Sequence, residues 1–122
     1  MLRPLGTLEQ EIMDILWKKK EGSVRDVFEV LKNGKSIAYT TVLTVMNRLV
    51  EKGCLRRKPD GNAFLYIAVQ TQEKFLGTTI KKFLNNLSKD FGKELVARQF
   101  AEGIESLDPK IAGELLKAYK KQ

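Results

Sequence analysis

Polar and basic side chains are frequent between residues 39 and 48, in a segment whose apolar residues recur at helical spacing. The set comprises Tyr39, Thr40, Thr41, Thr44, Asn47 and Arg48. Threonine hydroxyls bond bases or phosphates, asparagine pairs with an adenine edge, and arginine reaches guanine or a phosphate. The N–H groups at the start of such a helix also favour a phosphate. These residue types predict a surface that reads duplex DNA; the alternative, a plain solvated face, usually carries more glutamate and lysine.

Three consecutive cations, Arg56, Arg57 and Lys58, follow this run on an expected strand. Neighbouring side chains of a strand point to opposite faces, so two of the three face one way and one the other. Cations on a hairpin of this kind contact the DNA backbone or enter the minor groove, where they add affinity with little sequence preference. The alternative is an edge strand that its charges protect against aggregation.

Two short helices are expected before the polar run. Thr7 is the expected N-cap of the first, with Gln10 reaching back to it, and the helix should run to about Lys20, where Gly22 stops it. Met13 and Trp17 fall on its apolar side and are expected in the core. Ser23 with Asp26 repeats the capping pattern for the second helix, and Asn33-Gly34 is its expected end.

The polar run itself lies on a third expected helix, from about Ala38 to Lys52. At 100° per residue its core face carries Val42, Val45, Met46 and Leu49. Strands are expected at 55–58 and 63–69, with a turn over 59–62, and Phe64 and Tyr66 should pack this hairpin onto the helices rather than stack on bases. Three helices followed by a basic hairpin predict a mainly α fold, a winged helix-turn-helix, over residues 1–70.

Residues 71–122 are expected to form a purely helical second region. Asp108-Pro109 supplies an N-cap and a first-turn proline for its last helix. Short helices are marginal alone, so their apolar stripes need a partner surface, which we expect a second copy of the chain to provide. The expected homodimer contacts are Leu76, Ile80, Phe83, Leu84, Leu87, Leu95, Phe100, Ile111, Leu115 and Tyr119.

Composition narrows the function classes. The 122 residues contain no histidine and one cysteine, Cys54, and carry a net charge of +7. The missing histidine removes the commonest general base and metal ligand, and a lone thiol cannot build a zinc site, so we expect no enzyme, metal or cofactor. The basic excess favours an anionic partner such as nucleic acid. No apolar run could span a bilayer and Met1 to Pro4 does not resemble a signal peptide, so we expect a cytoplasmic protein without membrane insertion.

The run from Ala38 to Leu49, followed by Glu51-Lys52-Gly53, resembles the recognition helix of the penicillinase and methicillin-resistance repressor family. Leu8-Glu9 through Ile12-Met13 to Leu16-Trp17 resembles the first helix of that family. The resemblance implies a dimeric winged-helix repressor that binds inverted repeats in promoters, commonly of β-lactamase operons. It also implies DNA contacts at Thr41, Thr44 and Arg48. Thr40 and Leu43 replace residues that are often basic in staphylococcal-type members, so the operator sequence of those members is not carried over to this chain.

The same resemblance implies an off-switch, because family members are cleaved by a transmembrane sensor-protease between Asn and Phe. The matching bond here joins Gln99 to Phe100, so Phe is retained and Gln stands in place of Asn. A copper-sensing branch carries a C-terminal cysteine cluster, which this chain lacks.

Together these patterns predict a homodimeric, sequence-specific repressor that binds an inverted-repeat operator in duplex DNA and is released by proteolysis. The main rival is a winged-helix module that contacts other proteins and does not bind specific DNA. An enzyme is the weakest alternative because no histidine and no convergent carboxylate pair is present.

Overall fold

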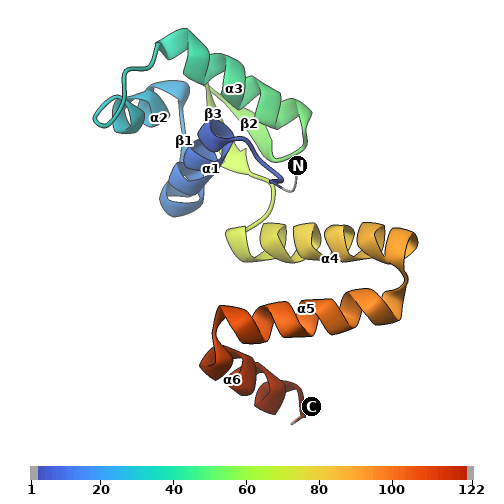
Figure 1. Cartoon of the computed structure of the whole chain (residues 1–122). Helices are drawn as coiled ribbons and strands as arrows, with labels where there is room; N and C mark the ends of the chain where they lie inside the picture. The colour runs from blue at the N-terminus through green and yellow to red at the C-terminus, as the bar shows by residue number, and fades with distance from the viewer. Residues whose placement is uncertain (1–2, 121–122) are drawn as a thin grey trace. The chain divides into compact units, whose positions relative to one another are not determined.

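A computed structural model of the chain describes residues 3–120, with side chains up to Ala118. In chain order the elements are α1 (Thr7–Lys19), β1 (Glu21–Gly22), α2 (Val24–Leu31), α3 (Tyr39–Glu51), β2 (Leu55–Asp60), β3 (Ala63–Ala68), α4 (Gln72–Phe91), α5 (Lys93–Leu107) and α6 (Pro109–Lys120) (Figure 1). They form two compact units that meet inside α4, between Gly77 and Thr78. We call them the winged head, up to Gly77, and the helical tail, from Thr78; the functional boundary at residue 70 stays a prediction.

The ends of α1 differ from the sequence expectation. Gly6, not Thr7, is the N-cap, and its N–H donates to Glu9 Oε1 at 2.9 Å. The Gln10 amide does not reach back but donates forward to Asp14 Oδ1. The helix stops at Lys20, whose φ of 81° is left-handed, so the expectation that Gly22 ends the helix was wrong. The capping pair of α2 is confirmed: Asp26 N–H donates to Ser23 Oγ, and the Ser23 N–H donates to the Asp26 carboxylate.

A three-stranded antiparallel sheet with the order β1-β3-β2 forms the wing (Figure 1). The strand β1 was not expected; it pairs Gly22 with Tyr66. The β2–β3 pairing runs on to Pro59–Phe64 and Asp60–Ala63, so the turn is only Gly61-Asn62. A two-residue hairpin turn requires positive φ at a central residue, and Gly61 adopts 62° without a side-chain penalty. The hairpin is therefore longer, and its turn tighter, than the turn expected over 59–62.

The core of the head lies between the three helices and the sheet. The predicted core face of α3 is confirmed, since all four of its side chains are buried, and Met13 is buried on α1. Trp17 packs partly buried beside this core, its ring centroid 5.5 Å from that of Phe75 in α4. Tyr66 packs the hairpin onto the helices as expected, whereas Phe64 is exposed and does not. The buried set is Leu5, Ile12, Met13, Leu16, Val24, Val27, Leu31, Val42, Val45, Met46, Leu49, Leu55 and Tyr66.

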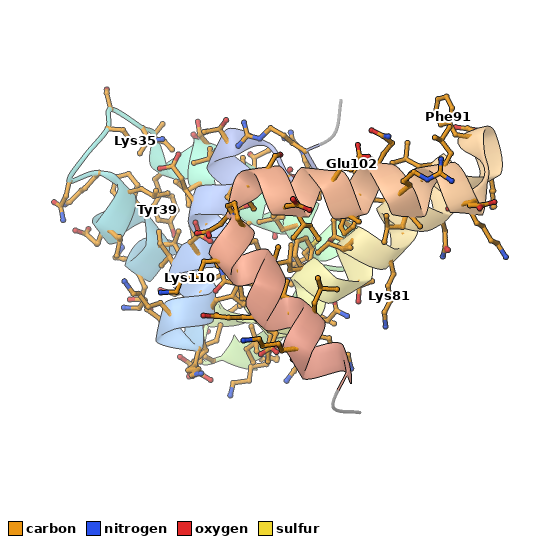
Figure 2. The ribbon with its side chains drawn as sticks, turned by 60° about the horizontal axis from the view of Figure 1, so that its bottom comes forward. Lys35, Tyr39, Lys81, Phe91, Glu102 and Lys110 are labelled. Carbon is orange, nitrogen blue, oxygen red and sulfur yellow. The ribbon has the colours of Figure 1, made fainter. Side chains whose placement is uncertain are left out.

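The helical tail comprises the rest of α4 with α5 and α6. Gly92, with a φ of 90°, separates α4 from α5. The predicted start of α6 is confirmed, because Asp108 Oδ1 accepts the N–H groups of Lys110 and Ile111 and Pro109 is the first helical residue. No residue of α4 or α5 is buried, and Phe91 projects into solvent at the end of α4 (Figure 2). Within residues 3–120, no helix is long and apolar enough to cross a membrane.

Candidate nucleic-acid interface

Helix α3 turns one face to the core and the other to solvent. Ala38 is the N-cap of α3 and gives no side-chain cap hydrogen bond. The first turn of α3 contains no acidic residue, so no carboxylate there competes with a phosphate for its N–H groups. Thr40, Thr41, Thr44 and Arg48 are exposed along the outward face. The Thr44 hydroxyl donates to the Thr40 carbonyl at 2.9 Å, so this side chain offers outward a methyl group and an oxygen that can only accept. Such a surface suits thymine methyl groups and donors on base edges.

Tyr39 is placed by α2 rather than left free at the start of α3. The Tyr39 ring meets Phe28 edge-on at 5.6 Å, and the Arg25 guanidinium lies 5.3 Å from the Tyr39 ring centroid. The ring therefore joins the two helices of the helix-turn-helix, and Lys35 in the intervening turn pairs with Glu11 of α1. The sequence analysis did not single out Arg25. The signal would have been a cation in the first turn of α2 that can reach an aromatic residue at the start of α3.

Asn47 lies differently from its expected position on the open arc of α3. It is half-buried, and its Oδ1 accepts a hydrogen bond of 2.9 Å from the Tyr66 hydroxyl and a long one of 3.4 Å from Arg57. These two donors come from β3 and β2. The structure thus brings Asn47 to the wing instead of exposing it with the threonines.

The three wing cations separate by face. Arg57 faces α3, and its guanidinium lies 4.9 Å from the Phe64 ring centroid. Arg56 and Lys58 line an open groove on the other face of the head, where Lys58 donates to Glu21 at 3.3 Å. All three are exposed. Arg57 is therefore the wing cation that shares a face with α3.

One buried carboxyl fixes the far end of α3. Lys52 Nζ lies 2.9 Å from both carboxylate oxygens of Glu9. Burial alone would raise the pKa of Glu9, but the Lys52 and Gly6 hydrogen bonds and the charges of Lys52 and Arg48 outweigh it, so this pKa lies below its ordinary value. Burial raises the pKa of the Cys54 thiol, which disfavours the reactive thiolate. Within the described residues, no group of three metal-ligating side chains comes together.

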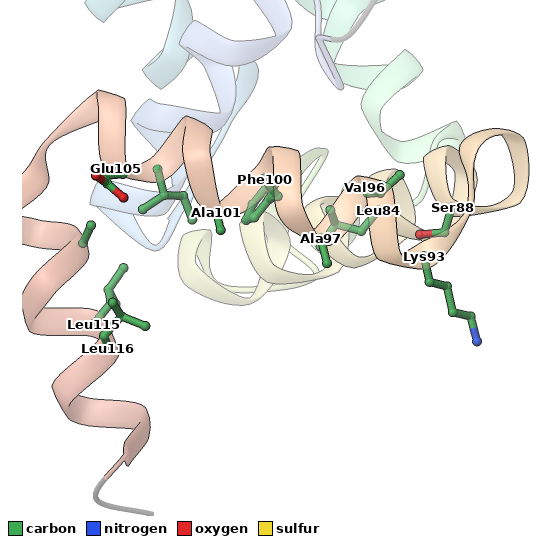
Figure 3. Close-up of a pocket in the computed structure, with 12 residues that line it drawn as sticks. Leu84, Ser88, Lys93, Val96, Ala97, Phe100, Ala101, Glu105, Leu115 and Leu116 are labelled. Atoms are coloured by element: carbon green, nitrogen blue, oxygen red, sulfur yellow. The ribbon is translucent and has the colours of Figure 1, made fainter.

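The expected dimer contacts are left uncovered in the single chain. Leu76 is 56% exposed, Leu95 48% and Ile111 51%; Ile80, Phe83, Phe100 and Leu115 are also exposed, whereas Leu84 and Leu87 are half-buried. The side chain of Tyr119 lies outside the described residues. Leu84, Phe100 and Leu115, from α4, α5 and α6, line an apolar groove of about 450 Å³ (Figure 3). Sequence reasoning missed Ile104 and Leu116, which line the same groove.

Gln99 and Phe100 both lie inside α5, and both are exposed. Phe100 lines the tail groove, so its side chain contributes to helix packing (Figure 3). Proteases bind extended backbone, and the bond between these residues is helical, so α5 would have to open locally before cleavage.

A three-helix head whose third helix carries an exposed Thr-Arg face beside a basic β-hairpin is a winged helix-turn-helix, a class of DNA-binding domain. The penicillinase repressor family model matches residues 5–120, and the chain belongs to this family. It is therefore a transcriptional repressor with a DNA-binding winged helix, and not an enzyme.

Two relatives and one solved structure give the extent of the similarity. The methicillin resistance regulatory protein MecI of Staphylococcus aureus is 30% identical over 92 residues, which cover 75% of each chain. The transcriptional regulator BlaI of Mycobacterium tuberculosis is 31% identical over 104 residues, which cover 84% of this chain and 75% of BlaI. The solution structure of the DNA-binding domain of the repressor BlaI shares the fold, with a TM-score of 0.52 and 24% identity over 59% of this chain and 88% of that domain.

Proposed function

We propose that this chain represses transcription as a homodimer that binds an inverted-repeat operator in duplex DNA. The carrying observation is the exposed face of α3, where Thr40, Thr41, Thr44 and Arg48 lie together without an acidic neighbour in the first turn. In this proposal α3 enters the major groove, its threonines and Arg48 contact base edges, and Arg57 contacts the backbone from the wing. Because its proposed partner is DNA, we expect the chain to be located in the cytoplasm.

The test of DNA reading begins with selection of bound sequences from random duplex DNA by the full chain. Operator affinity of Thr44→Ala and Arg48→Ala is then compared with that of Arg98→Ala, which removes an exposed arginine from the tail. We expect each α3 change to cost about 1–3 kcal/mol on the selected site and the control to cost little. Binding without salt dependence or sequence preference would overturn the proposal and favour a module that contacts proteins.

The tail is the proposed dimer interface, which joins two DNA-binding heads. The support is the number of large apolar side chains that the tail leaves in solvent, with Leu107 83% and Leu116 62% exposed. Burying apolar surface of this kind stabilises by about 25 cal/mol per Å², and a second copy supplies a matching surface. Two joined heads would bind two half-sites with an affinity raised about 10²–10⁴-fold over one head. Sedimentation of the full chain tests this, and a monomer at micromolar concentration would contradict it.

Release by a membrane sensor-protease at the Gln99–Phe100 bond is the proposed off-switch. A cut there removes the second half of α5 and all of α6, with Phe100, Ile104, Leu115 and Leu116 of the tail groove. The remaining Leu84 and Val96 would lose the side chains they share the groove with. A chain ending at Gln99 should self-associate more weakly and bind the operator more weakly than the full chain. Equal dimerisation and operator affinity in the two chains would exclude this bond as the switch.

The regulated genes proposed from the resemblance are of the β-lactamase type. Several curated relatives bear names that refer to methicillin resistance or penicillinase. The sequences selected from random DNA can be sought in promoters of the source genome. Sites confined to promoters of unrelated genes would overturn this part of the proposal and leave the DNA-reading part intact.

A further inference from the structure

We propose that Asn47 does not read a base but is a positioning residue that holds the wing against α3, so that Arg57 and the α3 surface bind DNA as one rigid unit. The inference rests on the proposed DNA binding by α3 and the wing. Its observation is the double contact at Asn47 Oδ1, which accepts from the Tyr66 hydroxyl at 2.9 Å and from Arg57 at 3.4 Å.

Arg57 fixes the orientation of the Asn47 amide. The two ends of an asparagine amide differ little in shape, so their assignment depends on the hydrogen-bond partners. A tyrosine hydroxyl can donate or accept and therefore suits either end. A guanidinium can only donate, so the atom that faces Arg57 must be the oxygen. The amide oxygen of Asn47 thus faces the wing.

This orientation is incompatible with adenine reading. Pairing with adenine uses both ends of the amide at once, because the oxygen accepts from the adenine N6 amino group and the NH₂ donates to N7. An amide oxygen has two lone pairs, and the Tyr66 and Arg57 donors occupy both. Asn47 could pair with adenine only by giving up these contacts, and the buried Tyr66 hydroxyl would then lose its partner.

Arg57, the wing cation that Asn47 contacts, is also restrained by an aromatic ring. Tyr66 is 2% exposed and is the residue of β3 that pairs with Arg57 of β2. Arg57 also lies over the Phe64 ring, at 4.9 Å. The Asn47 oxygen and the aromatic face together restrict the guanidinium, and its remaining N–H groups stay available to a phosphate. Removing the link would leave Arg57 present but no longer oriented.

The Tyr66→Phe variant tests the link without touching the DNA surface, because it deletes one buried hydroxyl and keeps the ring. On the sequences selected by the wild-type chain, we expect operator affinity to fall about five- to tenfold, the worth of one hydrogen bond. The slope of log K against log salt should flatten by up to about one, the value for one phosphate contact. The base preference should stay as in the wild type. A thermal melt reports any loss of stability separately.

A double-mutant cycle assigns the effect to Arg57. In an Arg57→Ala background, Tyr66→Phe should cause little further loss, because the cation it orients is gone. In a Lys58→Ala background it should keep its full effect, since Lys58 lies on the other face of β2. Unchanged affinity in Tyr66→Phe, or an equal loss in the Arg57→Ala background, would overturn the inference. A relaxed preference at one base pair in Asn47→Ala would also overturn it, by making Asn47 a reader.

These outcomes are distinct from failure of the proposed function. If the wild-type chain shows no salt-dependent binding to duplex DNA, the proposed function fails. If the wild-type chain binds and selects a sequence while Tyr66→Phe is silent, only the positioning role of Asn47 fails.

Discussion

The indole Nε1–H of Trp17 donates a 3.0 Å hydrogen bond to the carbonyl oxygen of Gln70, a residue 53 positions further along the chain. The Trp17 ring also packs against Phe75, in the first turn of α4. One side chain of α1 thus fixes both the residue that follows the wing and the helix that begins after it. The first turn of α4 therefore belongs to the packed head, although α4 continues into the tail.

Trp17→Phe should destabilise the head, because the Gln70 carbonyl loses its indole donor while most of the ring packing on Phe75 remains. The expected loss is about 1 kcal/mol in the free energy of unfolding. Urea denaturation followed by circular dichroism measures it. A Trp17→Phe chain as stable as the wild type would show that water replaces the indole donor at no cost.

Glu9→Gln should remove a pH-dependent part of the stability. The pKa of Glu9 is lower in the folded chain than in the unfolded one, so its charge stabilises the fold at neutral pH. This contribution is lost as the pH falls below the ordinary glutamate range and through the folded pKa. At neutral pH we expect a loss of about 1 kcal/mol, since Lys52 is half exposed and its ion pair is partly screened.

Chemical denaturation across a pH series distinguishes this effect from a general loss of stability. The Glu9→Gln chain should lose less stability than the wild type on acidification. The exposed Glu51 gives a matched control, Glu51→Gln, for the loss of one carboxylate outside the Lys52 contact. Parallel pH profiles for Glu9→Gln and the wild type would contradict the prediction.

Arg57→Ala and Lys58→Ala should differ in their effect on DNA binding, although the two residues are neighbours on β2. Arg57 faces α3, whereas Lys58 lies on the opposite face and pairs with Glu21. Loss of Arg57 should flatten the dependence of log K on log salt by about one, and loss of Lys58 by clearly less. Titration of the operator at several salt concentrations measures both slopes; equal slopes would mean that the two cations contribute alike.

Leu115→Lys should weaken self-association without unfolding the head. Leu115 lines the tail groove and is 43% exposed in the single chain, so a lysine there is tolerated in the monomer but is costly in a buried interface. The dissociation constant of the dimer should rise about tenfold or more, which corresponds to the loss of one buried leucine. Lys117→Ala, two positions on and on another side of α6, is the matched control. Sedimentation at several concentrations compares the two variants.

Residues whose environment is local were predictable from the sequence, and those that depend on distant partners were not. The core face of α3 follows from helical periodicity, which is why Val42, Val45, Met46 and Leu49 were placed correctly. The position of Asn47 depends on Tyr66, 19 residues away on another element, and no spacing rule reveals that contact.

Two backbone features were also beyond local signals. A lysine at positive φ is rare, so Gly22 was the natural expectation for the end of α1, yet Lys20 adopts that conformation. The strand β1 has two residues, too few to show an alternating pattern, and only its pairing with β3 defines it. The exposed Thr-Arg face of α3 was placed correctly as a surface, and its contact with DNA stays a prediction.

If the apolar tail pairs two chains, as proposed, the DNA-binding form of the repressor depends nonlinearly on the abundance of the chain. Below the dissociation constant of a pair, the number of paired chains rises with the square of chain concentration, so halving the supply of chain lowers the paired form about fourfold. Dilution of the chain as a cell grows and divides would then empty the operator faster than the chain itself disappears. The side chains that the tail leaves in solvent would thereby make gene expression sensitive to small changes in dosage.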